Sequence, residues 1–198
     1  MIELPEGVVP NAMAPALMDF GATVEPSSGA EALRIDRPGN RYRCNFGLPP
    51  QQMAKHGRVI VSRLIRAQRE GLRVPFHLAG VDQGLPGSPV VDDAGQAGMA
   101  LSLRGLTPGY AAKEGFWLSI EDAGGQHYLH NVAGTVIAGG DGKIVLPLSE
   151  MLRAPFADGA TVHLAKPMIE GMVSGDERAW EISLAHHLLT EFEIRETA

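Results

Sequence analysis

Apolar and polar residues alternate in three successive segments near the start of the chain, and this period of two predicts β-strands. The segments cover residues 17–25, 33–36 and 41–48. Residues rich in Pro, Gly, Ser and Asn separate them at 26–29 and 37–40, as expected for turns. The pattern predicts three strands, each with one buried and one solvated face.

After Pro49-Pro50 the hydrophobic period changes to that of a helix. One apolar stripe contains Met53, Gly57, Ile60, Leu64 and Ala67. Gly71 is a suitable residue to end the helix, because glycine adopts the left-handed conformation found just beyond many helix ends. We therefore predict one long helix over about residues 50–70.

The rest of the chain predicts short strands and many turns. Residues 80–98 are rich in Gly, Pro and Asp and are expected to be a connector. Residues 99–168 show several alternating segments, typical of a small β-barrel or sandwich domain. The alternating segments 180–187 and 191–195 are predicted to be strands and resemble the first strands, so we expect 1–79 and 170–198 to form one core around this insertion. The predicted fold is mainly β: a β-sandwich core with one packed long helix and an inserted small β domain.

Composition narrows the function classes. Hydrophobic residues make up 44% of the 198 residues and charged residues 20%, as in globular proteins. The formal net charge of -6 argues against general affinity for nucleic-acid backbones, and no sequence-specific nucleic-acid binding is expected. The N-terminal residues lack the basic segment of a signal peptide, and no window reaches the roughly 18 apolar residues of a membrane helix. We expect neither secretion by a signal peptide nor membrane insertion.

No set of residues predicts catalysis, a cofactor or a metal ion. Cys44, the single cysteine, lies on the apolar face of a predicted strand and is expected to be structural. His127 and His130 are three residues apart on a predicted strand, so their side chains point to opposite faces and do not converge on a metal. Asp92 and Asp93 lie in the connector without the ligand spacing of a calcium loop. The chain is expected not to be an enzyme.

Two clusters of opposite charge are candidates for a contact between subunits. The predicted helix carries Lys55, Arg58, Arg63, Arg66 and Arg69 opposite its apolar stripe. The C-terminal segment is acidic, because six carboxylates outnumber Arg178 and Arg195: Asp176, Glu177, Glu181, Glu191, Glu193 and Glu196. The alternative explanation for the basic residues of the helix is that they form a solvent-exposed face without a partner. The hypothesis is that this acidic segment contacts the basic helix of an adjacent copy.

Three aromatic residues of the insertion suggest a different function. Tyr110, Trp117 and Tyr128 could stack on sugar rings, and Trp117 lies on the strand face opposite Phe116 and Leu118. A carbohydrate-binding module is therefore an alternative. Packing of Trp117 under a loop or against another subunit explains the same observation.

Three stretches, 41–78, 113–167 and 179–196, together resemble the distal tail proteins of long-tailed bacteriophages. In the first, a strand and a long helix lead to Val74-Pro75-Phe76, which is similar to a V-P-hydrophobic segment of that family. In the second, Lys113 and Gly115 introduce a strand, and Asp141-Gly142 leads to Pro147-Leu148. In the third, the closing strands carry Trp180 and Phe192-Glu193.

The resemblance implies a structural virion protein of a siphophage-like tail tip, assembled in the host cytoplasm. Such proteins form a β-sandwich with a packed helix and commonly a hexameric ring. The ring joins the tail tube protein to the baseplate hub protein and docks tail fibres or receptor-binding proteins. The alternative among structural tail proteins is a different adaptor protein of the tail.

Overall fold

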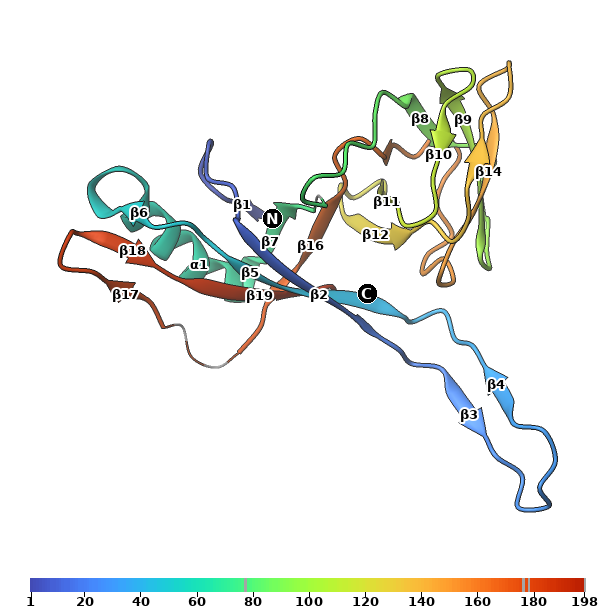
Figure 1. Cartoon of the computed structure of the whole chain (residues 1–198), viewed down its shortest axis with the longest axis horizontal. Coiled ribbons are helices and arrows are strands. Elements are labelled where there is room, and N and C mark those ends of the chain that lie inside the picture. Colours follow the sequence, from blue (N-terminus) through green and yellow to red (C-terminus); the bar gives the residue numbers. More distant parts are fainter. Residues whose placement is uncertain (77, 176, 178, 198) are drawn as a thin grey trace. The chain divides into compact units, whose positions relative to one another are not determined.

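The computed structural model of the chain describes residues 1–76, 78–175, 177 and 179–197 (Figure 1). It is mainly β with one long helix, which confirms the predicted fold class. The chain divides into two compact units. Unit 1 contains residues 1–17, 41–75 and 169–197, and unit 2 contains residues 18–40 and 76–168. Residues 18–40, expected in the core with the first strands, thus group with unit 2.

Unit 1 is built around a six-stranded sheet with the strand order β1-β7-β16-β19-β5-β2. Its strands are β1 (Ile2–Glu3), β2 (Ala12–Met18), β5 (Arg41–Gly47), β7 (Leu72–Pro75), β16 (Met168–Val173) and β19 (Glu191–Arg195). The C-terminal strand β19 pairs antiparallel with β5, placing Phe192 opposite Phe46 with their rings stacked at 5.5 Å. Pro15 lies on β2 at the edge of the sheet, which is where sheets accommodate proline.

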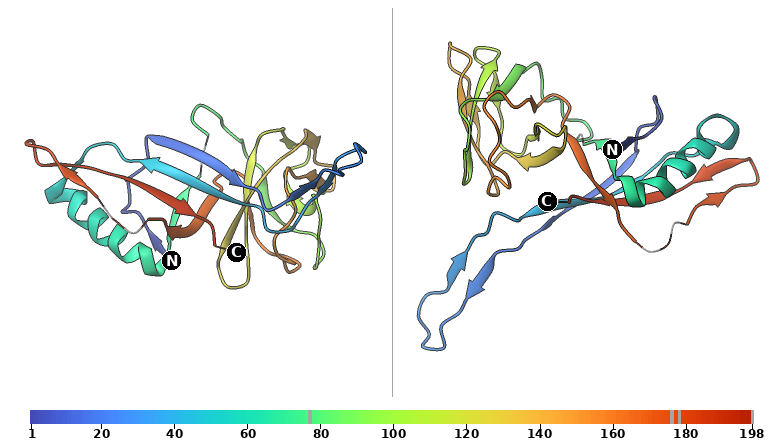
Figure 2. Two further views of the ribbon diagram at one scale, coloured as in Figure 1. Left: turned by 90° about the horizontal axis from the view of Figure 1, so that it is seen from below. Right: turned by 180° about the vertical axis from the view of Figure 1, so that it is seen from behind.

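One helix packs on this sheet, as the two views of Figure 2 show. It begins with a wider π-helical turn, η1 (Met53–Gly57), and continues as α1 (Arg58–Glu70). Gly57, Ile60, Leu64 and Ala67 of the predicted stripe are buried. Gly71 ends the helix with a φ of 74°, and its N–H donates to the carbonyl of Ala67. The long helix is therefore confirmed, although residues 51–52 form the short strand β6 (Gln51–Gln52) in place of its first turn.

A three-stranded sheet completes unit 1, in the order β17-β18-β6. The alternation over 180–187 predicted one strand, but the chain forms a tight hairpin of β17 (Glu181–Ile182) and β18 (His187–Leu189). His186 closes this turn in the left-handed conformation, with a φ of 59°. The His186 N–H donates to the carbonyl of Ser183, and Leu184 at the tip of the turn is fully exposed. The alternating apolar residues of 180–187 therefore belong to a turn and to the short strands on either side of it.

Unit 2 contains three sheets that enclose a second core. The strand orders are β14-β9-β8, β12-β11-β15 and β10-β13. Their bounds are β8 (Gly87–Val91), β9 (Ala100–Leu106), β10 (Ala111–Ala112), β11 (Trp117–Glu121), β12 (His127–Asn131), β13 (Val136–Ile137), β14 (Ile144–Pro147) and β15 (Val162–His163). The predicted connector 80–98 contains β8, which pairs with β9. Leu101, Leu103, Leu118, Ile120 and Leu146 are fully buried in one cluster, which forms the core of these sheets.

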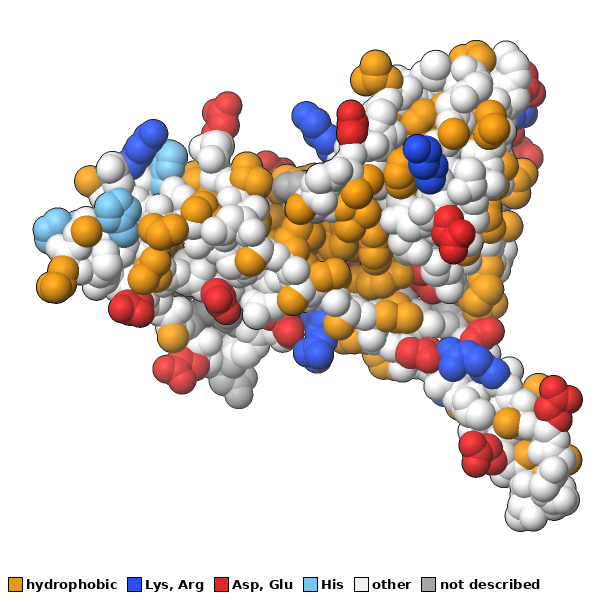
Figure 3. All heavy atoms as spheres, in the orientation of Figure 1, with side chains coloured by type: hydrophobic (Ala, Val, Ile, Leu, Met, Phe, Trp, Pro, Cys, Tyr) orange, Lys and Arg blue, Asp and Glu red, His pale blue; other side chains and the backbone are white. Residues whose placement is uncertain are grey.

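Residues 18–40 form a separate hairpin of β3 (Ala22–Val24) and β4 (Leu33–Ile35), which among the described strands pair only with each other. The single strand predicted over 17–25 is interrupted at Asp19-Phe20-Gly21, where the Asp19 carboxylate accepts the Gly21 N–H. Val24, Leu33 and Ile35 are 48%, 62% and 42% exposed. Figure 3 shows hydrophobic side chains on the surface of this hairpin beside acidic ones. The predicted strands exist, but neither has a buried face.

Candidate functional site

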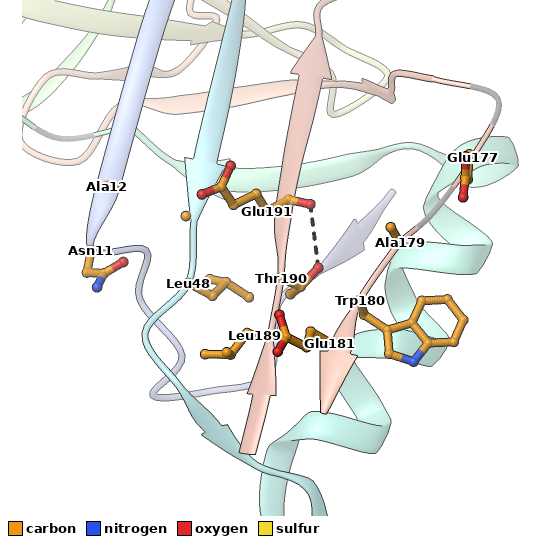
Figure 4. A pocket seen from close by; sticks show the side chains of 11 residues that line it. Asn11, Ala12, Leu48, Glu177, Ala179, Trp180, Glu181, Leu189, Thr190 and Glu191 are labelled. Carbon is orange, nitrogen blue, oxygen red and sulfur yellow. Dashed lines mark hydrogen bonds between the residues drawn. The ribbon is translucent and has the colours of Figure 1, made fainter. Parts of the chain in front are cut away.

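A groove in unit 1 lies beside the C-terminal strands, with a cavity volume of about 740 Å³ (Figure 4). Leu48, Leu189 and Thr190 line it from the β5 and β18–β19 side, and the segment 179–181 lines it from the other. In Figure 4, the side chains of Trp180 and Glu181 point to opposite sides of the backbone where β17 begins. Trp180 and Leu189 are partly exposed, so the groove offers apolar surface to solvent.

The groove is acidic. Glu177, Glu181 and Glu191 line it, and no described Lys or Arg belongs to its lining. Within the described part of the chain, none of these three carboxylates forms an ion pair. The groove therefore combines three negative charges with exposed apolar surface.

Other acidic residues of the C-terminal segment are not part of this groove. Glu193 forms an ion pair with Arg43 at 3.2 Å on the neighbouring strand. The Glu196 side chain is buried and accepts the Tyr42 N–H at 2.7 Å. Asp176 and Arg178 lie outside the described residues. Of the predicted acidic interface, Glu181 and Glu191 lie together in the groove, whereas Glu193 is neutralised within its own sheet.

The five basic residues of the helix also divide into two groups. Arg63 donates to the carbonyl of Glu3 at 2.7 Å, and Arg66 forms a two-point contact with Glu70 one turn later at 2.7 and 3.0 Å. Arg69 and Arg58 are exposed, as is Lys55 in η1, and among the described residues they have no ion-pair partner. These last three are the cations available for a partner.

One exposed stripe of α1 joins two of these cations through an apolar residue. Arg58, Ile65 and Arg69 are spaced by seven and four residues, which places them on one helix face. Ile65 is exposed between them. We call Arg58, Ile65 and Arg69 the basic stripe, and Glu177, Trp180, Glu181, Leu189 and Glu191 the acidic groove. The positions of Ile65 and Trp180 on these two surfaces do not follow from the charge pattern, although an apolar residue on the polar face of the predicted helix is a signal in the sequence.

The three aromatic residues proposed for sugar stacking do not form an open platform. Tyr128 is buried, with Phe156 against its ring at 5.3 Å and the Arg153 guanidinium over it at 5.2 Å. Trp117 packs against Phe76 at 4.6 Å between ring centres. The Tyr110 hydroxyl donates to the carbonyl of Gln83 at 2.7 Å, and burial raises the pKa of Tyr110 to about 12. Their rings are occupied by packing within unit 2.

The Cys44 side chain is fully buried on β5. Burial raises the pKa of its thiol to about 11, because the thiolate is poorly solvated there. A protonated, inaccessible thiol is a poor nucleophile and a poor metal ligand. The structure therefore places Cys44 where it packs as a small apolar residue.

His127 and His130 lie on opposite faces of β12, as the sequence predicts. His130 faces the core and contacts Glu150 at 2.8 Å, and both side chains are buried. His127 faces the other way, where a different histidine and a carboxylate approach it. The side chains of Glu121, His127 and His163 each place one possible metal-ligand atom within 4.8 Å of the others. The sequence pattern does not group His163 and Glu121 with His127, because His127 and His163 are 36 positions apart and only the sheet pairing brings them together.

No helix among the described residues has the length and apolarity needed to cross a membrane. The chain matches no protein-family model and no curated protein sequence at a significant level.

Proposed function

We propose that this chain is a structural subunit of a siphophage-like tail tip, and that it assembles by contacts between copies. The ordered resemblance of residues 41–78, 113–167 and 179–196 to distal tail proteins supports the tail-tip assignment. The observation that carries the assembly mechanism is that unit 1 exposes two different, complementary surfaces, the basic stripe and the acidic groove.

Two different surfaces that fit each other generate a heterologous contact, in which each copy uses its stripe on one neighbour and its groove on the other. Arg58 and Arg69 supply two positive charges, and the groove supplies Glu181 and Glu191 to receive them. Such contacts close into a ring when the rotation between neighbouring copies is a whole-number fraction of a full turn. A hexamer is the ring size implied by the family resemblance.

The apolar part of the contact provides affinity, and the charges provide orientation. Ile65 on the stripe and Leu189 and Trp180 in the groove are partly exposed in the single chain. Burying such side chains removes apolar surface from water, at about 25 cal/mol per Å². The flanking charges favour approach in one register, and their long-range part is screened by salt.

The test is the molar mass of the purified chain by multi-angle light scattering at low and high ionic strength, with negative-stain imaging of the largest species. We expect oligomers at low salt, ring-shaped particles among them, and smaller species at high salt. Arg58→Glu combined with Arg69→Glu is expected to give monomers at both ionic strengths. Arg37→Glu, a single charge reversal at an exposed position in the turn 37–40, is a control for reversal outside the basic stripe and should assemble normally.

A mixing experiment separates the proposed contact from a general charge effect. A second variant, Glu181→Arg with Glu191→Arg, should also be monomeric alone, since its groove repels the native stripe. Mixed in equal amounts, the two variants present opposite charges at every contact and should form oligomers again. A monomeric native chain at low salt, or oligomers unaffected by either double reversal, contradicts the proposed assembly.

A further inference from the structure

We propose that Glu121, His127 and His163 form a binding site for a zinc ion on one face of the sheet β12-β11-β15. The site lies in unit 2 and uses none of the residues of the basic stripe or the acidic groove. Zinc binding and assembly are therefore separable in experiments.

The strand register places the three side chains on the same face. Glu121 on β11 is directly opposite His127 on β12, and Ser119 on β11 is directly opposite His163 on β15. Residues directly opposite each other share a face, and so do residues two apart on one strand. Ser119, Glu121, His127 and His163 thus lie together, on the face turned away from the core residues Leu118 and Ile120.

The distances suit a metal site that tightens on binding. The His163 Nε2 lies 3.1 Å from the Glu121 Oε2, and the rings of His127 and His163 are 4.8 Å apart between centres. Tetrahedral zinc with bonds of about 2.0–2.2 Å places its ligands roughly 3.4 Å apart. Three ligand atoms within 4.8 Å therefore need to close by about an ångström. Glu121 and His163 have this freedom, because their side chains are 35% and 33% exposed.

His127 is the fixed ligand. It is almost fully buried, and the Ser119 hydroxyl lies 3.2 Å from its Nδ1. Ser119 is itself positioned by the Met168 N–H, which donates to its oxygen at 3.0 Å. An oriented histidine whose second nitrogen contacts a hydrogen-bonding group is the usual arrangement at zinc sites. The contact of Ser119 with Nδ1 fixes the orientation of the His127 ring beside Glu121 and His163.

The ligand set favours zinc over magnesium or calcium. Two imidazole nitrogens and one carboxylate suit zinc and other late first-row metals, whereas magnesium and calcium prefer oxygen ligands alone. Solvent reaches the exposed side of Glu121 and His163, where a water molecule can supply the fourth ligand. Binding would connect β11, β12 and β15, and so cross-link residues that are 42 positions apart in sequence, from 121 to 163.

The test is isothermal titration of the full, untagged chain with zinc chloride after treatment with a chelator. We expect one saturable site per chain and a rise in the thermal midpoint of unfolding with zinc, since a ligand that binds only the folded state stabilises it. Cobalt(II) in place of zinc should give a visible spectrum of a four-coordinate site with nitrogen and oxygen ligands. His163→Ala is expected to abolish saturable binding, and Glu121→Gln to weaken it while keeping a side chain of similar shape.

Ser119→Ala tests the positioning role and should weaken zinc binding by about 10- to 100-fold, the usual effect of removing an outer-shell partner. His187→Ala, on β18 of unit 1, is the histidine control outside the site and should bind zinc as the native chain does. Because His163 is partly exposed, its replacement should leave the circular dichroism spectrum unchanged. No saturable binding by the native chain, or equal binding by His163→Ala, overturns the proposal and leaves the cluster a hydrogen-bonded network only.

Discussion

Two hairpins of the chain, β3–β4 and β11–β12, have the same alternating sequence pattern but opposite environments. In β11–β12, Leu118, Ile120 and Leu129 have no exposed surface. In β3–β4, Val24, Leu33 and Ile35 are between 42% and 62% exposed. Both hairpins are antiparallel and in regular register.

The difference shows what alternation encodes. Alternation with a period of two indicates that a strand has one apolar and one polar face. Whether the apolar face is covered depends on other parts of the chain or on another molecule. The sheet β12-β11-β15 is covered by the rest of the unit 2 core, whereas no third strand among the described residues joins β3–β4.

The largest effect is expected from Ile120→Ala on β11. Ile120 is fully buried in the unit 2 cluster, so its truncation leaves a cavity and should lower the free energy of unfolding by about 2–5 kcal/mol. Urea denaturation followed by the fluorescence of Trp117, in a Trp180→Phe background, measures unit 2 selectively. A loss below about 1 kcal/mol would show that this core is loosely packed.

A somewhat smaller effect is expected from Glu150→Ala, which removes the partner of the buried His130 on β12. The 2.8 Å contact between them is lost and a polar ring stays buried without it, which should cost about 2–4 kcal/mol. Glu150→Gln keeps an oxygen that can accept from His130 and should lose less. Thermal unfolding of both variants measures the difference, and equal losses would mean that the hydrogen bond contributes little.

Leu33→Ser on the exposed hairpin should change the free energy of unfolding by no more than about 0.5 kcal/mol, because Leu33 is already in water. The same urea denaturation as for Ile120→Ala makes the comparison direct. If Leu33→Ser destabilises the chain by more than about 1 kcal/mol, the hairpin is covered in solution. Light scattering of the variant would then show whether another copy covers it.

The smallest effect concerns the ion pair of Arg34 with Asp19 on the same exposed hairpin, at 2.7 Å. The hydrogen bond from Arg34 holds the pKa of Asp19 below its ordinary value of 3.8. A carboxyl whose pKa is lower in the folded state stabilises that state above its unfolded pKa, and the contribution is lost as the pH falls through the folded value. NMR titration of the Asp19 carboxyl should show this lowered pKa, and Arg34→Ala should raise it toward the ordinary value, while the hydrogen bond from the Gly21 N–H still lowers it.

The long helix shows what the local sequence pattern can predict. Its stripe of Ile60, Leu64 and Ala67 and its end at Gly71 follow from residues within the helix itself, and each lies where the sequence predicts. The predicted strand over 180–187 failed for a local reason too, because His186 takes a left-handed conformation that alternation does not reveal. The candidate zinc ligands could not be predicted locally, since His127 and His163 share a face only through their separate pairing with β11.

The sequence by itself determined the mainly β fold, the single long helix, the inward faces of β11 and β5 and the buried character of Cys44. These depend on the spacing of apolar residues over a few positions. Only the tertiary structure decided which carboxylates remain unpaired among the described residues, since Glu193 pairs with Arg43 on β5 and Glu191 does not, and which histidines meet. The physical reason is that an ion pair or a ligand set depends on distances of a few ångströms between segments far apart in the chain, and strand pairing sets those distances.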